Sequence, residues 1–170
     1  MSQNLSKWYA LHTRSNFEQK VYDCLLNKTF EAFLPRIQVM SRRRKRRDKI
    51  FVPMLSGYVF VRSDLEPECH LEILKTPGVV RMVGFSGKAV PADEEEISSL
   101  MILDGTDRTV TNRAYMRKGD RIMVTDGPLK GLIGFYLRHK GQSDKVVVSV
   151  ELLRRSIAVE LEGAALEKMP

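Results

Sequence analysis

Gly57-Tyr58-Val59-Phe60-Val61 is the strongest strand signal in the first half of this 170-residue chain. Aromatic and β-branched residues fit the pleated, half-buried surface of a sheet, and a glycine suits the turn before it. Residues 7–12 and 79–83 are apolar runs of the same kind, and Arg36 to Met40 continues extended. The short apolar run 30–34 is followed by Pro35, so we expect it at a sheet edge.

Three helices are expected between and after these strands. The first follows Ser15, a good N-cap residue, and Glu18 lies three positions later, which is the pattern of a capping box. The second begins at Pro67, because proline suits a first helical turn. The third opens in the acidic stretch 93–96, where negative charge interacts favourably with the helix dipole. Its expected apolar face comprises Ile97, Leu100 and Met101.

The composition changes after residue 104. Residues 105–116 are polar and lack periodicity, which predicts a linker. Strand-like runs separated by glycines then follow at 121–125, 132–138, 145–150 and 156–161. Short strands at this spacing predict a small barrel. The predicted layout is an α+β domain over 1–104, a linker over 105–116, a small β domain over 117–163 and a tail over 164–170.

The positive charge is concentrated in the first third of the chain. The net charge is +7, yet residues 1–50 carry 12 Lys/Arg and 4 Asp/Glu, whereas residues 51–170 carry 16 and 17. Much of the excess lies in one run, which comprises Arg42, Arg43, Arg44, Lys45, Arg46 and Arg47. This run falls where a hairpin tip is expected and favours a polyanionic partner, although a solvated loop is the alternative. It carries no signature of base readout.

Several functional classes find no support in the sequence. Cys24 and Cys69 are too few for a disulfide framework, and neither has the neighbours of a zinc site. The longest uncharged stretch, Phe51 to Val61, is too short to span a bilayer, and no secretory signal is apparent. Cys69 and His70 are adjacent and would point in different directions on a helix. We therefore expect a cytoplasmic protein with no membrane attachment, no catalytic residue, no metal and no cofactor.

Two sets of motifs together resemble one known family. WYALHTRSNFE (8–18), SGYVFV (56–61) and TPGV (76–79) are similar to the N-terminal domain of the NusG transcription-elongation family. GDRIMVTDGPLKGLIG (119–134) looks like the KOW motif that opens the C-terminal barrel of that family. The resemblance covers nearly the whole chain. It implies an antiparallel four-stranded sheet flanked by helices in the N-terminal domain, followed by a small all-β, SH3-like KOW barrel.

The resemblance also implies a non-enzymatic role in transcription. Members of the family dock on the β′ clamp helices of bacterial RNA polymerase, reduce pausing and promote antitermination. An apolar, aromatic cleft suits a helix pair, and the matching positions are Trp8, Tyr9, Leu55 and Tyr58. Core residues of a strand pair are the alternative interpretation of these positions. Cys69 and His70 match a stretch that touches the β-subunit gate loop in one specialised paralogue, and the run 42–47 matches a hairpin that would contact upstream or non-template DNA.

The KOW motif implies a further partner. Leu152, Leu153 and Arg154 match a stretch that binds a ribosomal small-subunit protein or the terminator Rho, although the family usually has Phe-Gly where this chain has Leu153-Arg154. Where the family has Phe-Pro, this chain has Leu55-Ser56. These departures favour a specialised paralogue of the RfaH/UpxY type, acting on selected operons, over the housekeeping NusG. We expect the chain to be a monomer. The alternative from another class is a general RNA- or ribosome-binding KOW module.

Overall fold

The computed structural model describes residues 5–40, 49–105, 109–110, 119–137, 144–161 and 166–169. The chain forms two compact units, each made from two segments of the sequence. Unit 1 comprises Met1–Pro35 and Pro53–Glu94, and unit 2 comprises Arg36–Val52 and Glu95–Pro170. Arg36–Val52 and the third helix from Glu95 onward are thus grouped with the C-terminal strands.

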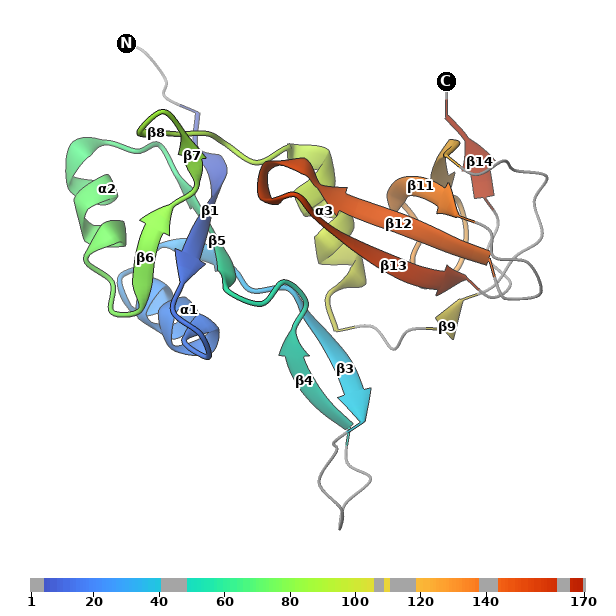
Figure 1. Ribbon diagram of the computed structural model, residues 1–170, viewed down its shortest axis with the longest axis horizontal. Helices are drawn as coiled ribbons and strands as arrows, with labels where there is room; N and C mark the ends of the chain where they lie inside the picture. Colours follow the sequence, from blue (N-terminus) through green and yellow to red (C-terminus); the bar gives the residue numbers. More distant parts are fainter. Residues whose placement is uncertain are drawn as a thin grey trace. The chain divides into compact units, whose positions relative to one another are not determined.

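Unit 1 contains a four-stranded antiparallel sheet, as the resemblance implies (Figure 1). Its strands in spatial order are β2 (Glu31–Phe33), β5 (Tyr58–Ser63), β1 (Lys7–Thr13) and β6 (Val79–Met82). The edge position of β2 confirms the prediction made from Pro35. A small hairpin of β7 (Gly84–Phe85) and β8 (Lys88–Ala89) follows β6 and was not predicted, since two-residue strands have no periodicity to detect.

The two faces of this sheet have different neighbours. Tyr9 and Leu11 pair with Val61 and Val59 and lie in a buried cluster that includes Val21 and Leu25 of α1 (Glu18–Asn27) and Ile73 of α2 (Pro67–Leu74). Because side chains alternate along a strand, the residues between them point to the other face. We call it the Trp8 face, and its members on β1 and β5 are Trp8, Ala10, His12, Tyr58, Phe60 and Arg62.

The predicted capping box of α1 is wrong. The helix begins at Glu18, and no side chain caps its N-terminus. The Glu18 carboxylate instead accepts a hydrogen bond of 2.8 Å from the Gly57 N–H and is buried. Asn16 has φ of 62°, so the backbone turns sharply between Ser15 and the helix and the reciprocal bonds of a capping box are not made.

Unit 2 is built on a six-stranded sheet. Its strands in spatial order are β14 (Leu166–Lys168), β10 (Arg121–Val124), β11 (Ile133–Leu137), β12 (Asp144–Val150), β13 (Arg155–Leu161) and β9 (Thr109–Val110). The four predicted strands correspond to β10–β13. The other two lie in the predicted linker and tail: β9 pairs with β13 and β14 with β10.

Unit 2 also contains α3 (Glu94–Leu103) and a two-stranded sheet of β3 (Arg36–Met40) and β4 (Lys49–Pro53). The apolar face of α3 was predicted in part, because Ile97 and Leu100 are buried but Met101 is 43% exposed. The Ser99 hydroxyl donates to the Ile133 carbonyl at 3.2 Å and accepts from the Ile133 N–H at 3.1 Å. An ion pair between Glu95 and Arg121 adds a second connection between α3 and the sheet.

Candidate functional site

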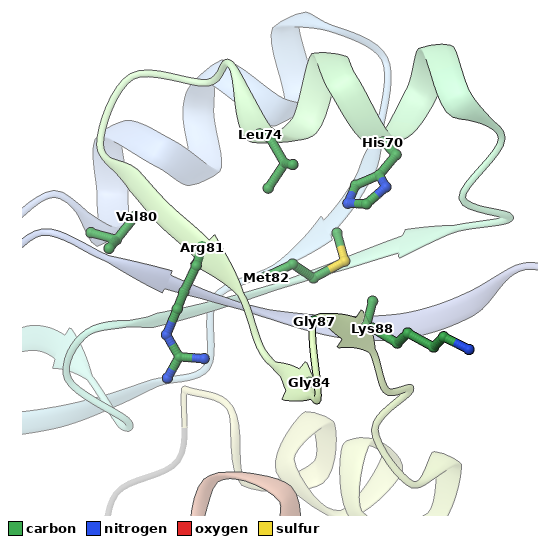
Figure 2. Close-up of a pocket in the computed structure, with 9 residues that line it drawn as sticks. His70, Leu74, Val80, Arg81, Met82, Gly84, Gly87 and Lys88 are labelled. Atoms are coloured by element: carbon green, nitrogen blue, oxygen red, sulfur yellow. The ribbon is translucent and has the colours of Figure 1, made fainter.

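A pocket of about 460 Å³ opens in unit 1 between α2, β6 and the β7–β8 hairpin (Figure 2). Its lining residues are His70, Leu74, Val80, Arg81, Met82, Gly84, Gly87, Lys88 and Ala89. Figure 2 shows His70 and Leu74 pointing from α2 toward Met82 on the strand below. Strand β6 forms one wall of the pocket and is held in place by antiparallel pairing with β1, in which Met82 lies opposite Leu11 and Arg81 opposite His12.

The pocket combines apolar and cationic groups. Leu74 and Met82 supply apolar surface and Lys88 supplies positive charge, while Arg81 lines the edge of the pocket with its guanidinium directed away from Leu74 and Met82 (Figure 2). Val80, which also lines the pocket, is 54% exposed. Phe85, on strand β7 of the hairpin that borders the pocket, is 79% exposed. Exposed apolar side chains around a hollow are typical of a docking surface. The arrangement suits a partner that presents an apolar side chain beside a carboxylate or a phosphate.

The two predicted residues of α2 differ in their positions. Both Cys69 and His70 are half-buried, but only His70 lines the pocket. The helix follows the pattern expected from the sequence, with Pro67 in its first turn. The remaining pocket residues were not singled out in the sequence, because the hollow is formed by a two-residue hairpin that leaves no local pattern.

Aromatic side chains cover much of the Trp8 face. Trp8 is 3% exposed, and its ring meets Phe33 edge-on at 6.4 Å between centroids. The Arg62 guanidinium lies 5.9 Å from the centre of the Trp8 ring, within the range of a cation–π interaction. Phe33 stacks in turn on Phe60 at 6.2 Å.

His12, Tyr58 and Arg81 form a polar row at one end of this face. His12 lies directly opposite both Tyr58 and Arg81, so the three side chains point to the same side of the sheet. Tyr58 is half-buried, and the centre of its ring lies 5.5 Å from the centre of the His12 imidazole. His12 Nδ1 is buried and has no hydrogen-bond partner among the described residues. This row therefore offers aromatic surface and one cationic side chain, while His12 Nδ1 is enclosed by the protein.

Tyr9 and Leu55 lie outside the row that His12, Tyr58 and Arg81 form. Tyr9 is 8% exposed and packs in the cluster under α1 and α2, on the face opposite Trp8. Leu55 is 5% exposed, and its carbonyl accepts a hydrogen bond of 3.2 Å from the Tyr58 N–H across a turn. Gly57 takes φ of 86° in that turn, a conformation that glycine adopts without strain. Of the four positions matched to the clamp-binding cleft, Tyr58 retains the most exposed surface, and the binding role of all four stays a prediction.

The remaining predicted sites lie in unit 2. The run Arg42–Arg47 is outside the described residues, although β3 and β4, which flank it, are described and pair with each other. Leu152 and Leu153 belong to a 3₁₀ turn, Glu151–Leu153, between β12 and β13. Leu153 is buried, Leu152 is half-buried, and Arg154 is exposed with φ of 51°. That left-handed conformation explains why a glycine would be favoured at this position.

Metal-binding clusters and membrane-spanning helices are both absent from the described residues. No group of three or more His, Cys, Asp or Glu side chains in these residues could hold a metal ion. None of the helices among them is long and apolar enough to cross a membrane.

Comparison with known proteins identifies the family. The NusG model, described as "Transcription termination factor nusG", matches residues 6–101, which is more than half of the chain. The chain belongs to the NusG family. The match spans the whole four-stranded sheet of unit 1, together with α1, α2 and the pocket beside His70.

Relatives from several bacteria are similar over 95% of this chain. The "Transcription termination/antitermination protein NusG" of Thermus thermophilus is 26% identical, with 98% of its own length covered. Its counterpart in Helicobacter pylori strain J99 is 23% identical with 98% covered. The Streptomyces coelicolor protein is 28% identical, but this chain spans only 63% of its length.

A solved structure has a similar fold. The structure titled "Domain interaction in Thermotoga maritima NusG" has a TM-score of 0.60 and 22% sequence identity to this chain. The alignment covers 97% of this chain and 98% of that one. The similarity therefore extends beyond the residues matched by the family model and includes the C-terminal strands.

Proposed function

We propose that this chain is a non-enzymatic transcription elongation factor that binds the β′ clamp helices of RNA polymerase, reduces pausing and promotes antitermination. The observation that carries the proposal is the NusG match over residues 6–101. These residues build the sheet that positions Tyr58 and the pocket that contains His70. No catalytic step is needed, because a factor that binds the elongating polymerase more tightly than the paused one shifts the equilibrium between them.

The clamp helices are proposed to contact the Trp8 face at its polar end. Tyr58 and His12 supply adjacent rings there, and Arg81 supplies a positive charge in the same row. Trp8 and Phe60 lie farther along the same face and are buried, so we assign them to shaping the sheet beneath the contact. The pocket beside His70 is a second contact, for the β gate loop, whose partner group would be apolar with a neighbouring acid.

The rest of the chain is proposed to add nucleic-acid and protein contacts. The run 42–47 would bind phosphates of upstream or non-template DNA, since a cluster of six cations favours a polyanion. The sheet of β10–β14 is proposed to be a KOW barrel that recruits a ribosomal small-subunit protein or Rho through Leu152 and Leu153. The departures Leu55-Ser56 and Arg154 from the family pattern favour a specialised paralogue that serves selected operons.

The first experiment measures binding to bacterial core RNA polymerase, with a housekeeping NusG as competitor. We expect saturable binding that the competitor displaces, because both proteins would occupy the clamp helices. Tyr58→Asp should abolish this binding, because it replaces the aromatic ring of the contact by a charged group that loses water on binding. Leu26→Asp is the matched control, because it adds the same charge at a 43% exposed apolar position on α1. Binding that persists in Tyr58→Asp, or that the competitor leaves intact, contradicts a clamp-helix contact on this face.

The basic run supports a second candidate, a general RNA- or ribosome-binding module. Such a protein would bind polyanions with strong salt dependence and ignore polymerase. Deleting Arg42–Arg47 should then remove all binding activity, while Tyr58→Asp should leave nucleic-acid binding almost intact. Under the elongation-factor proposal, the same deletion weakens DNA binding but preserves competition with NusG for polymerase.

A further inference from the structure

The outer edge of β6 is open. This strand is the last one in the sheet of unit 1, and no described strand pairs with its outer side. Arg81 lies opposite His12 on β1, and the Val83 N–H donates to the Ala10 carbonyl at 2.8 Å. Because the backbone groups of an antiparallel strand alternate in direction, the N–H and the carbonyl of Met82 face away from β1. An unpaired edge of this kind can accept a further strand.

The pocket beside His70 lies along this edge and has two anchored walls. One wall is α2, which contributes Leu74 and is fixed to the core by the fully buried Ile73 (Figure 2). The other wall is the β7–β8 hairpin. Its turn residues, Ser86 and Gly87, have φ of 50° and 77°, and such a pair of positive values is typical of a tight two-residue hairpin turn. The space beside β6 is therefore pre-organised for an extended segment.

The side chains of β6 indicate which segment fits. Successive side chains face opposite sides of a sheet, and Met82 lies on the side of α2, near Leu74. Arg81 belongs to the row on the opposite face. Arg81 and Lys88 are both exposed, and neither forms an ion pair with another described residue. A strand beside β6 would therefore match this edge best with an apolar side chain next to Met82 and an adjacent acidic side chain next to Arg81.

We propose that the outer edge of β6 binds an extended protein segment by strand addition, and that this segment alternates apolar and acidic residues. Main-chain hydrogen bonds to Met82 hold the segment, an apolar residue fills the space beside Leu74, and acidic residues pair with Arg81 and Lys88. The inference rests on the proposed function in one respect, the assignment of this pocket to a protein contact with polymerase. It adds the binding mode and the residue pattern of the partner.

The first test uses the full-length chain and two short peptides, one that alternates Val and Glu and one that alternates Val and Lys. We expect the Val–Glu peptide to bind more tightly, by a margin that shrinks as salt is added, because the attraction to Arg81 and Lys88 is screened. Hydrogen exchange of residues 79–85 should slow when this peptide binds, whereas exchange in β2, at the opposite edge of the sheet, should stay unchanged. Equal affinity for the two peptides, or unchanged exchange in 79–85, overturns the inference.

Matched variants separate the main-chain bond from the side chains. Met82→Ala removes the side chain, whereas Met82→Pro also removes the outward N–H and spares the bonds to β1. We expect Met82→Pro to bind the Val–Glu peptide about 2- to 12-fold more weakly than Met82→Ala, the range for one net hydrogen bond. Lys88→Glu should weaken the preference for this peptide, and Lys130→Glu, which adds the same charge at an exposed site in unit 2, should leave it unchanged. Circular dichroism verifies the fold of each variant, and equal affinities of the two Met82 variants overturn the inference.

Core RNA polymerase separates this inference from the proposed function. We expect residues 79–85 to exchange more slowly in the polymerase complex, and Met82→Pro to weaken polymerase binding more than Met82→Ala. Polymerase binding without slower exchange in 79–85 overturns strand addition and leaves the elongation-factor proposal in place. Absence of polymerase binding, with binding of the Val–Glu peptide that Met82→Pro weakens, overturns the elongation-factor proposal and supports the strand-addition site.

Discussion

Gly78 is the residue at which backbone conformation and core packing constrain the sequence together. Its φ is 96°, and a Cβ there would lie 2.8 Å from Phe17 Cδ1 and 2.9 Å from Val21 Cγ2. We predict that Gly78→Ala lowers the free energy of unfolding by about 2–5 kcal/mol. Roughly 1–2 kcal/mol comes from the left-handed backbone and about 1–3 from overpacking. Urea denaturation followed by circular dichroism measures the change.

The control for this prediction is Gly87→Ala. Gly87 has φ of 77°, but a Cβ there would meet nothing within 4 Å. Only the backbone cost applies, so we expect a decrease of about 1–2 kcal/mol. Equal decreases in the two variants would show that Phe17 and Val21 move aside without cost.

Glu18 is a positioning residue for the turn that precedes Tyr58. We predict that Glu18→Ala destabilises the chain by about 1–3 kcal/mol, because it leaves the Gly57 N–H without its charged acceptor. Binding to polymerase should weaken as well, since the turn sets the direction in which β5 begins. Thermal unfolding and the competition assay measure the two effects. Gln19→Ala, on the exposed side of α1, removes only a local bond to Asp23 and should change both by little.

Residue identity alone could not predict these roles. The spacing of Ser15 and Glu18 is that of a capping box, yet Glu18 reaches a backbone group 39 positions away. Local sequence contains no information about that partner. The opposite facing of Trp8 and Tyr9 does follow from strand alternation, but which face packs under helices depends on segments far along the chain.

Elements with long, regular patterns were predictable. The strand runs at 7–12 and 58–61 and the helix that begins at Pro67 correspond closely to β1, β5 and α2. The two-residue strands β7, β8 and β9 were missed, because their pairing depends on backbone bonds and not on an apolar pattern. The pocket at His70 depends on the β7–β8 hairpin, which is why the candidate site was only partly predictable.

The third helix yields a prediction about which strands it stabilises. Ser99 is 2% exposed, and its hydroxyl satisfies both backbone groups of Ile133. Ser99→Ala removes both bonds from the half-buried Ile133 backbone, at a cost of about 0.5–1.5 kcal/mol for each bond. We predict that hydrogen exchange accelerates in β10 and β11 and stays unchanged in β1 and β5.

Met101→Ala on the same helix is the control for Ser99→Ala. Its side chain is 43% exposed and removing it should alter exchange by little in either unit. Faster exchange in β1 and β5 upon Ser99→Ala would contradict the assignment of α3 to unit 2.

At the scale of the whole molecule, packing and charge divide the chain in different ways. A change of composition after residue 104 predicts a domain boundary there, followed by a linker over 105–116. Each of the two compact units is made from two separate segments of the chain, so that Arg36–Val52 groups with residues 95–170. Hydrogen bonds such as that of Arg36 with Asp104 join residues 68 positions apart, and composition does not encode them. The charge excess, in contrast, is read directly from the sequence.

Because most of the basic excess lies in the run 42–47, the salt dependence of nucleic-acid binding should depend mainly on that run. Residues 1–50 carry 12 Lys/Arg against 4 Asp/Glu, whereas the rest of the chain carries 16 against 17. Replacing all six residues of the run 42–47 by Ser should reduce the slope of log affinity against log salt by about 0.7 for each phosphate of a single strand that the run neutralises. Replacing the run by six lysines keeps the charge, so the slope should stay the same. Fluorescence anisotropy titrations across a salt series measure it. A slope that survives the serine replacement would locate the phosphate-binding residues outside the run and remove the charge argument for nucleic acid.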